Sequence, residues 1–156
     1  MKSYARQMHA DILTYLNTQR IGVIALEMPD GSPHASTVHF AHVGDMPVFI
    51  FETDRRYKKS EALHVRPISR ASLVIGFEES KKSCTLQIDG EARIIGADEQ
   101  EKIDAYLSKF PEKSAKAQGE NVIFFELKPT WWRFTVFGRV EGMTVYLSDG
   151  TVKVGK

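Results

Sequence analysis

The segment from Val48 to Leu63, VFIFETDRRYKKSEAL, places cations and hydroxyls where a strand gives way to a helix. The apolar run that ends at Thr53 predicts a β-strand, and helical spacing begins at Tyr57. The junction carries four cationic and three hydroxyl side chains, on Thr53, Arg55, Arg56, Tyr57, Lys58, Lys59 and Ser60. Exposed N–H groups at a helix start favour an anion, and lysine supplies the charge that a phosphomonoester needs. The segment therefore predicts a phosphate site, with a solvated basic face as the alternative.

Composition limits the classes of partner that the chain can have. Its 156 residues, 42% of them hydrophobic, fit one domain over residues 1–156 with a sizeable core. The formal net charge is +1, so there is no global basic field for nucleic acid, and no nucleic-acid partner is expected. The single cysteine, Cys84, excludes an intramolecular disulfide and favours a reducing, cytoplasmic setting. No segment approaches the ~20 apolar residues of a membrane span, and the N-terminus lacks the apolar core of a signal peptide.

Periodicity and turn residues predict a chain dominated by strands. Eight strands are expected, at residues 21–27, 34–41, 47–53, 71–77, 83–95, 121–128, 131–140 and 143–147, the fifth bending at Gly90. Three helices are expected, around residues 4–16, 57–66 and 98–110, the last opened by a capping box of Asp98 and Glu101. The polar segment 111–120 is expected to be a linker. Because the strands follow one another and do not alternate with helices, the fold class is mainly β (α+β), an antiparallel barrel.

Four motifs in this order resemble the FMN-binding split β-barrel family related to pyridoxamine 5′-phosphate oxidase: IGVIALEMPDGSPHASTVHF, PVFIFETDRRYKKSEAL, RPISRASLVIGFE and TLQIDGEARII. The resemblance covers roughly residues 10–137. It implies an antiparallel split β-barrel with a few flanking helices, FMN as the cofactor, and a homodimer with flavin sites at the interface.

The resemblance also implies eight cofactor-binding residues: Ser36, Thr37, Val38, Thr53, Lys58, Lys59, Thr85 and Trp132. In the family, a strand shaped like PHASTVHF lies against the flavin, and a Thr with a basic pair holds the ribityl phosphate. Residues of later strands reach the flavin of the partner protomer. Successive side chains of a strand point to opposite faces, so only one set from PHASTVHF can line a pocket. Trp131 and Trp132 likewise lie on opposite faces, and core packing is the alternative for either indole.

The chain also departs from the pyridoxamine phosphate oxidases proper. They carry arginine where this chain has Ser36, and their C-terminal Arg and His pair has no clear match, so vitamin B6 oxidation is not expected. We expect a flavin-dependent oxidoreductase that passes electrons from a reduced nicotinamide to another acceptor, with no catalytic side chain assigned. The alternatives are a non-catalytic flavin or haem binder and a deazaflavin-dependent reductase. His39 and His42 would lie on opposite faces of a strand, so no metal site is expected.

Overall fold

The computed structural model describes residues 7–76, 83–138 and 142–155, and within these ranges nine strands form one antiparallel sheet. The strands are β1 (Ile21–Glu27), β2 (Pro33–His39), β3 (Ala41–Val43), β4 (Val48–Asp54), β5 (Ser69–Ile75), β6 (Ser83–Ile94), β7 (Val122–Phe137), β8 (Met143–Leu147) and β9 (Val152–Gly155). The helices are α1 (Ala10–Thr18), α2 (Ser60–Val65) and α3 (Gln100–Lys109), with short 3₁₀ helices η1 (Pro111–Lys113) and η2 (Lys116–Gln118).

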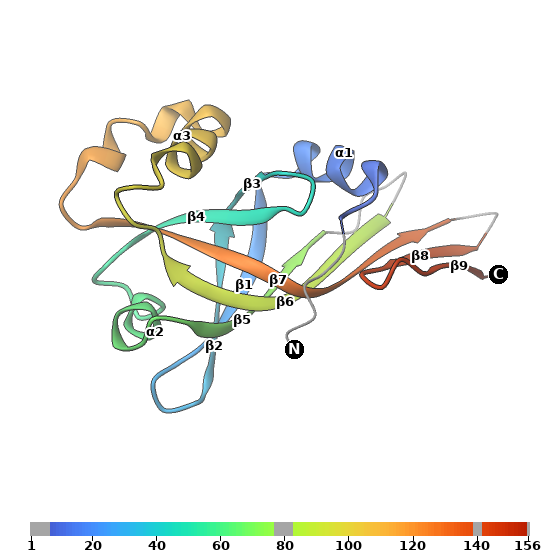
Figure 1. The fold of residues 1–156 in the computed structure, drawn as a ribbon, viewed down its shortest axis with the longest axis horizontal. Coiled ribbons are helices and arrows are strands. Elements are labelled where there is room, and N and C mark those ends of the chain that lie inside the picture. The colour runs from blue at the N-terminus through green and yellow to red at the C-terminus, as the bar shows by residue number, and fades with distance from the viewer. Residues whose placement is uncertain (1–6, 77–82, 139–141, 156) are drawn as a thin grey trace.

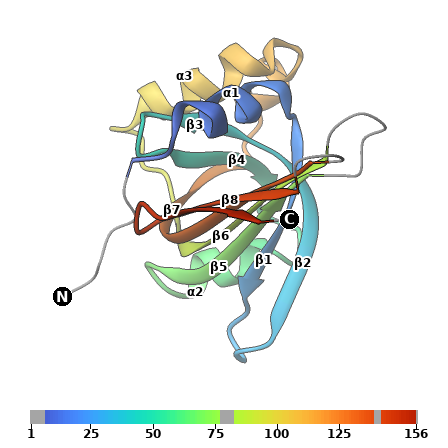
Figure 2. The same cartoon turned by 90° about the vertical axis from the view of Figure 1, so that its right-hand side faces the viewer.

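The sheet curls until its two ends meet. Hydrogen-bonded neighbours follow the order β2-β1-β5-β6-β7-β4-β3, and β8 and β9 extend the sheet beyond β7. The curl, seen from two sides in Figures 1 and 2, brings β2 into contact with β4, although no hydrogen-bond ladder joins them. We call this unpaired junction of β2 and β4 the seam. An antiparallel sheet that closes without pairing its last strands is a split barrel, so the predicted fold class is confirmed.

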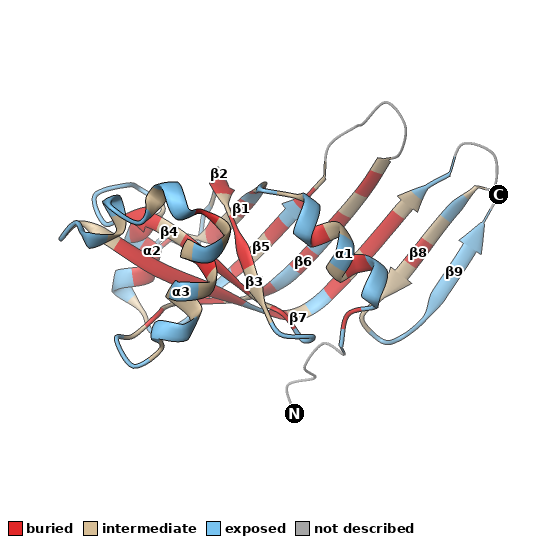
Figure 3. Cartoon of the chain, turned by 90° about the horizontal axis from the view of Figure 1, so that it is seen from above, coloured by how far each residue is buried: buried red, intermediate tan, exposed pale blue. Residues whose placement is uncertain are grey.

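Two apolar clusters bury both faces of β4. The larger cluster fills the barrel interior and includes Phe49, Phe51 and Phe125. The smaller one lies between β4 and α3 and includes Tyr106 and Phe110, as the apolar stripe of this helix predicts. Along the strands, buried and exposed positions alternate (Figure 3), because only one face of most strands meets the barrel interior. Consecutive side chains at the end of β4 therefore belong to different layers.

The strands predicted at residues 121–128 and 131–140 differ from what the structure shows. The two strands expected within residues 121–140 form one strand, β7, which runs through Pro129, and residues 139–140 lie outside the described part. The strand register shifts between Asp89 and Gly90, and Pro129 lies opposite Gly90. The ladder is interrupted there, so the missing N–H of proline costs little. A Cβ on Gly90 would lie 2.3 Å from the carbonyl oxygen of Lys128, and this close approach requires glycine. The register shift falls at Gly90, where the sequence predicts a bend, and bulges of this kind bend a strand.

The capping box expected from Asp98 and Glu101 is wrong. The N-cap of α3 is Glu99, and its side chain makes no capping hydrogen bond. The Glu99 carboxylate instead accepts hydrogen bonds from the backbone N–H of Gly96 at 3.0 Å and from the Arg93 guanidinium at 2.5 and 2.9 Å. The N-cap thus lies one residue later than the predicted Asp98, and its carboxylate binds an arginine of β6 and does not cap the helix.

Other boundaries change because of contacts distant in sequence. The strand expected at residues 34–41 is divided at Phe40 into β2, which pairs with β1, and β3, which pairs with β4. The expected linker at 111–120 contains η1 and η2, and β9 adds a strand after the Asp149-Gly150 turn. The first helix begins at Ala10; residues 1–6 and Phe77 lie outside the described ranges. No helix within these ranges has the length and apolar character of a membrane span.

Candidate functional site

The seam contains buried polar atoms that have no partner. In the described part of the chain, three buried side-chain oxygens lack a hydrogen bond: Ser36 Oγ on β2, and Glu52 Oε2 and Thr53 Oγ1 on β4. Only 4% of Thr53 is exposed. A buried hydroxyl without a partner costs on the order of 1–3 kcal/mol, so native proteins seldom leave one unused. These oxygens therefore mark both faces of β4 at the seam, Thr53 on the barrel side with Phe51 and Glu52 on the α3 side with Ile50, as places where a bound polar group would find donors and acceptors.

The loop after β4 is fixed by its own charges. The Asp54 carboxylate accepts hydrogen bonds from the backbone N–H of Arg56 at 2.9 Å and from its guanidinium at 2.9 and 2.7 Å. These bonds to Arg56 lower the pKa of Asp54 to about 2. The Ser60 hydroxyl donates to the Asp54 carbonyl at 2.7 Å and ties the start of α2 to the end of β4. Arg56 thus shapes the loop. Because α2 is only six residues long, its N-terminus contributes little to anion binding, and the lysine side chains are the groups to consider.

Lys58 and Lys59 have different surroundings. Lys59 is half-buried, with its ammonium 6.0 Å from the centre of the Tyr57 ring. Burial lowers the pKa of Lys59, and the positive charges of Lys113 and Lys116 lower it further. Lys58 is exposed and lies toward the turn between β1 and β2, where hydrogen bonds from Ser32 mainly lower the pKa of Asp30 and Lys58 adds a small contribution. The two lysines that the sequence suggests as a pair therefore differ in burial and in the charged groups that act on them.

The segment Pro111–Gln118 brings two more lysines to the same end of the barrel. The Lys113 ammonium lies 3.1 Å from the Tyr106 hydroxyl and 3.1 Å from Nδ1 of His39. The Lys116 ammonium lies 3.2 Å from Oε1 of Glu52, whose side chain is only 3% exposed. Sequence reasoning missed both lysines because it treated residues 111–120 as a linker. The available signal was their three-residue spacing directly after the apolar stripe of α3, which ends at Phe110.

The contact with Lys113 defines the state of His39. A lysine ammonium can only donate, so Nδ1 of His39 must accept, and its ring proton lies on Nε2. Burial lowers the pKa of His39, and the charges of Lys113 and Arg20 add to this effect. The imidazole also packs edge-on against Phe110, with ring centroids 5.2 Å apart. His39 is therefore a neutral acceptor that positions Lys113, not an additional cation.

The other candidates fall into two environments. Val38 and Trp132 belong to the barrel core, with 5% and 3% of each residue exposed. Thr37 and Thr85 lie on the outer face of the sheet, because Thr37 pairs with Val23, which is 38% exposed, and Thr85 shares the outer face of β6. Within one chain, the structure gathers Ser36, Thr53 and Lys59 around the seam and its adjoining loop. It does not bring the outer-face residues or Trp132 to that place.

The exposed indole in this region belongs to Trp131. Trp131 is 39% exposed and pairs with Asp89, so it shares the outer face with Thr85, while Trp132 is enclosed by its own chain. The assignment of Trp132 to a cofactor stays a prediction, and its burial favours the core-packing alternative. Of the two indoles, Trp131 is the one that a partner could reach.

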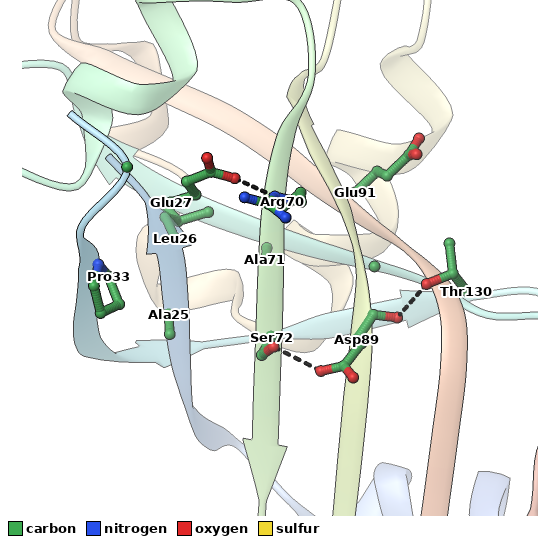
Figure 4. Close-up of a pocket in the computed structure, with 12 residues that line it drawn as sticks. Ala25, Leu26, Glu27, Pro33, Arg70, Ala71, Ser72, Asp89, Glu91 and Thr130 are labelled. Carbon is green, nitrogen blue, oxygen red and sulfur yellow. Dashed lines mark hydrogen bonds and ion pairs between the residues drawn. The ribbon is translucent and has the colours of Figure 1, made fainter. Parts of the chain in front are cut away.

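A depression of about 530 Å³ on the sheet offers less to a ligand than the seam. In the close-up of Figure 4, Arg70 pairs with Glu27, the Ser72 hydroxyl lies 2.6 Å from an oxygen of Asp89, and Thr130 donates to the Asp89 carbonyl. These polar groups already satisfy one another. Nowhere among the described residues do three His, Cys, Asp or Glu side chains converge as metal ligands would. The seam, with its unpartnered oxygens and lysines, is the stronger candidate site.

Comparisons with known proteins support this view of the fold. A family model described as pyridoxamine 5′-phosphate oxidase matches residues 8–136. No curated protein matches the chain. A pyridoxamine 5′-phosphate oxidase-related, FMN binding protein from Nostoc punctiforme superposes with a TM-score of 0.67 at 16% identity, covering 94% of this chain and 96% of that one.

Two longer proteins also share the fold. A heme binding protein from Mycobacterium smegmatis has a TM-score of 0.64 at 20% identity, covering 84% of this chain and 54% of its own. A protein of unknown function from Agrobacterium tumefaciens has a TM-score of 0.66 at 16% identity, covering 81% and 57%. The chain thus spans little more than half the length of these two proteins. At such identities the likeness shows a common fold and leaves the ligand open.

Proposed function

Since the chain belongs to the pyridoxamine 5′-phosphate oxidase family, we propose that it binds FMN and holds the flavin phosphate at the seam. One observation carries this proposal: Ser36 Oγ and Thr53 Oγ1 are buried without partners at the seam, and β4 leads directly into the loop of the half-buried Lys59. Hydroxyls and an ammonium are the donors that a phosphomonoester requires. The residues present therefore fit the phosphate end of FMN.

The side chains around the seam would bind and orient the cofactor. Lys59 would donate to a phosphate oxygen and balance its charge, and the hydroxyls of Thr53 and Ser36 would donate to the remaining polar atoms. The bond from Ser60 to the Asp54 carbonyl keeps this loop against the end of β4, so the donors are held before the ligand arrives. Bound FMN would supply the redox chemistry, and we propose an oxidoreductase that takes electrons from a reduced nicotinamide.

We further propose that the protein is a homodimer in a reducing cytoplasm. Val23 and Val74 pair directly on the outer face and remain 38% and 44% exposed. Trp131 and Thr85 share that face, so a second copy seated there would cover apolar surface and bring Thr85 and an indole toward the partner's seam. The single cysteine, Cys84, is buried and has no second thiol to join, which suits a reducing compartment.

Titration of the purified protein with FMN, riboflavin, haem and a deazaflavin tests the cofactor assignment. We expect FMN to bind more tightly than riboflavin, because the phosphate contacts of Thr53 and Lys59 are absent from riboflavin. Equal affinities for these two flavins would remove the phosphate from the argument. Tighter binding of haem would favour the alternative of a haem binder, and preference for the deazaflavin would favour a deazaflavin-dependent reductase. Steady turnover with NADH or NADPH separates an oxidoreductase from a flavin store.

A further inference from the structure

We propose that the segment Pro111–Gln118 forms a second wall of the anion site, in which Lys113 and Lys116 act with Lys59 to bind the phosphate of a phosphorylated polyol. The proposal deepens the proposed function, since FMN belongs to this chemical class. These two lysines do not belong to the loop after β4. They follow α3 in the sequence, more than fifty residues after Lys59.

The segment is held firmly enough to position its lysines. Glu112 pairs with Arg20 at 2.6 Å, and the Arg20 guanidinium lies 4.8 Å from the centre of the Phe110 ring. Lys113 rests 5.4 Å from the same ring centre and contacts the Tyr106 hydroxyl and His39, so its ammonium is already placed on the seam side of α3. In two views, α3 and the segment that follows it lie at the same end of the molecule as α2 (Figures 1 and 3).

The charges in this region do not balance. Lys59, Lys113 and Lys116 lie close enough to act on one another, and burial together with these neighbours lowers the pKa of both Lys59 and Lys113. Of the carboxylates that act on Lys113, Glu112 is engaged by Arg20, and Glu52 also pairs with Lys116. The single charge of Glu52 cannot offset both lysines. A phosphomonoester, which carries roughly −1.5 to −2 near neutral pH, would supply the missing negative charge.

The free oxygen of Glu52 narrows the class of ligand. Its Oε1 binds Lys116, whereas Oε2 is buried and has no donor. An ionised carboxylate oxygen only accepts hydrogen bonds, so Oε2 would repel a phosphate oxygen but would accept a bond from a hydroxyl. The lysines and Glu52 together therefore suit a ligand that carries a phosphate and a neighbouring hydroxyl. A sugar or polyol phosphate has both groups, and inorganic phosphate has only the first.

The test compares Lys113→Ala/Lys116→Ala with Lys128→Ala/Lys153→Ala, which removes the same charge from exposed positions on β7 and β9. Dissociation constants for FMN and riboflavin are measured by titration, and thermal unfolding checks that each variant folds. We expect the first variant to weaken FMN binding by at least about tenfold and riboflavin binding by less than about twofold, with the control unchanged. If the alanine variant fails to fold, the variant Lys113→Gln/Lys116→Gln is used in its place, because glutamine removes the charge but keeps a hydrogen-bond donor at each position.

The outcomes separate this proposal from the proposed function. If wild-type protein prefers FMN over riboflavin and the Lys113/Lys116 variant keeps that preference, the second wall is refuted while FMN binding stands. If wild-type protein binds FMN no better than riboflavin, the proposed function fails. In that case, a thermal-shift comparison of ribose 5-phosphate with inorganic phosphate, at constant ionic strength, tests whether the anion site exists independently of flavin binding. A shift from ribose 5-phosphate that exceeds that from phosphate and depends on Lys113 and Lys116 supports the site, and its absence overturns it.

Discussion

Replacing Lys59 by alanine should weaken FMN binding far more than the same change at Lys58. Lys59 is half-buried beside Tyr57 and within the field of Lys113 and Lys116, so its ammonium cannot be replaced readily by water. A hydrogen bond to a charged group contributes about 1.5–3 kcal/mol, which corresponds to a rise in the FMN dissociation constant of about 10- to 100-fold. Lys58 is exposed, and contacts of exposed charges contribute about 0–1 kcal/mol, or about fivefold at most.

Isothermal titration of FMN and riboflavin into wild type, Lys59→Ala and Lys58→Ala measures the difference. Riboflavin serves as an internal control, because it lacks the phosphate but keeps the ring and the ribityl chain. The Lys59→Ala variant should lose most of the FMN preference and bind riboflavin as wild type does. Equal losses of FMN affinity in the Lys58→Ala and Lys59→Ala variants would refute the distinction between the exposed and the half-buried lysine. A Lys59→Ala variant that loses both flavins alike would show that Lys59 supports the fold or the ring and not the phosphate.

The remaining predictions concern stability, pH, assembly and substrate. The Glu126 carboxylate is buried and lies 2.7 Å from both Arg93 and Lys102, so Glu126→Gln should lower the free energy of unfolding by about 2–4 kcal/mol in urea; an unchanged midpoint would contradict this. Burial, aided by Lys113, holds the pKa of His39 below 6.5. The unfolded chain therefore takes up this proton at higher pH than the folded chain, and the free energy of unfolding should fall as the pH drops below 6.5, less steeply in His39→Gln. If the dimer uses the outer face, light scattering should report a dimer for wild type and a monomer for Val74→Asp, with Val152→Asp on β9 as the exposed control; a wild-type monomer with full FMN affinity would refute the shared site. Conversion of pyridoxamine 5′-phosphate should be negligible in an assay for pyridoxal phosphate, because the resemblance to those oxidases implies that Ser36 replaces one of their arginines; rapid turnover would show this implied alignment to be wrong.

Local patterns in the sequence determined most of the strands and the position of the loop. The run from Ile21 to Glu27 and the segment beginning at Ser83 are strands as expected, because side-chain alternation and turn residues act within a few positions of one another. The same local signal identified Thr53 and the basic loop. It was misleading at the start of α3, where a capping box of Asp98 and Glu101 was expected but the N-cap is Glu99, whose carboxylate binds Arg93.

Only the tertiary structure decided which of the charged residues act together. Lys113 meets His39 although 74 positions separate them, and Lys116 meets Glu52, because α3 packs against β4 and carries the following segment to the seam. The divergence of Lys58 and Lys59 likewise depends on what surrounds the loop, namely the turn between β1 and β2 on one side and this segment on the other. Local propensity acts over a few residues, whereas the partners of a charge depend on which strand edges meet when the sheet curls, and no short window of sequence contains both members of such a pair.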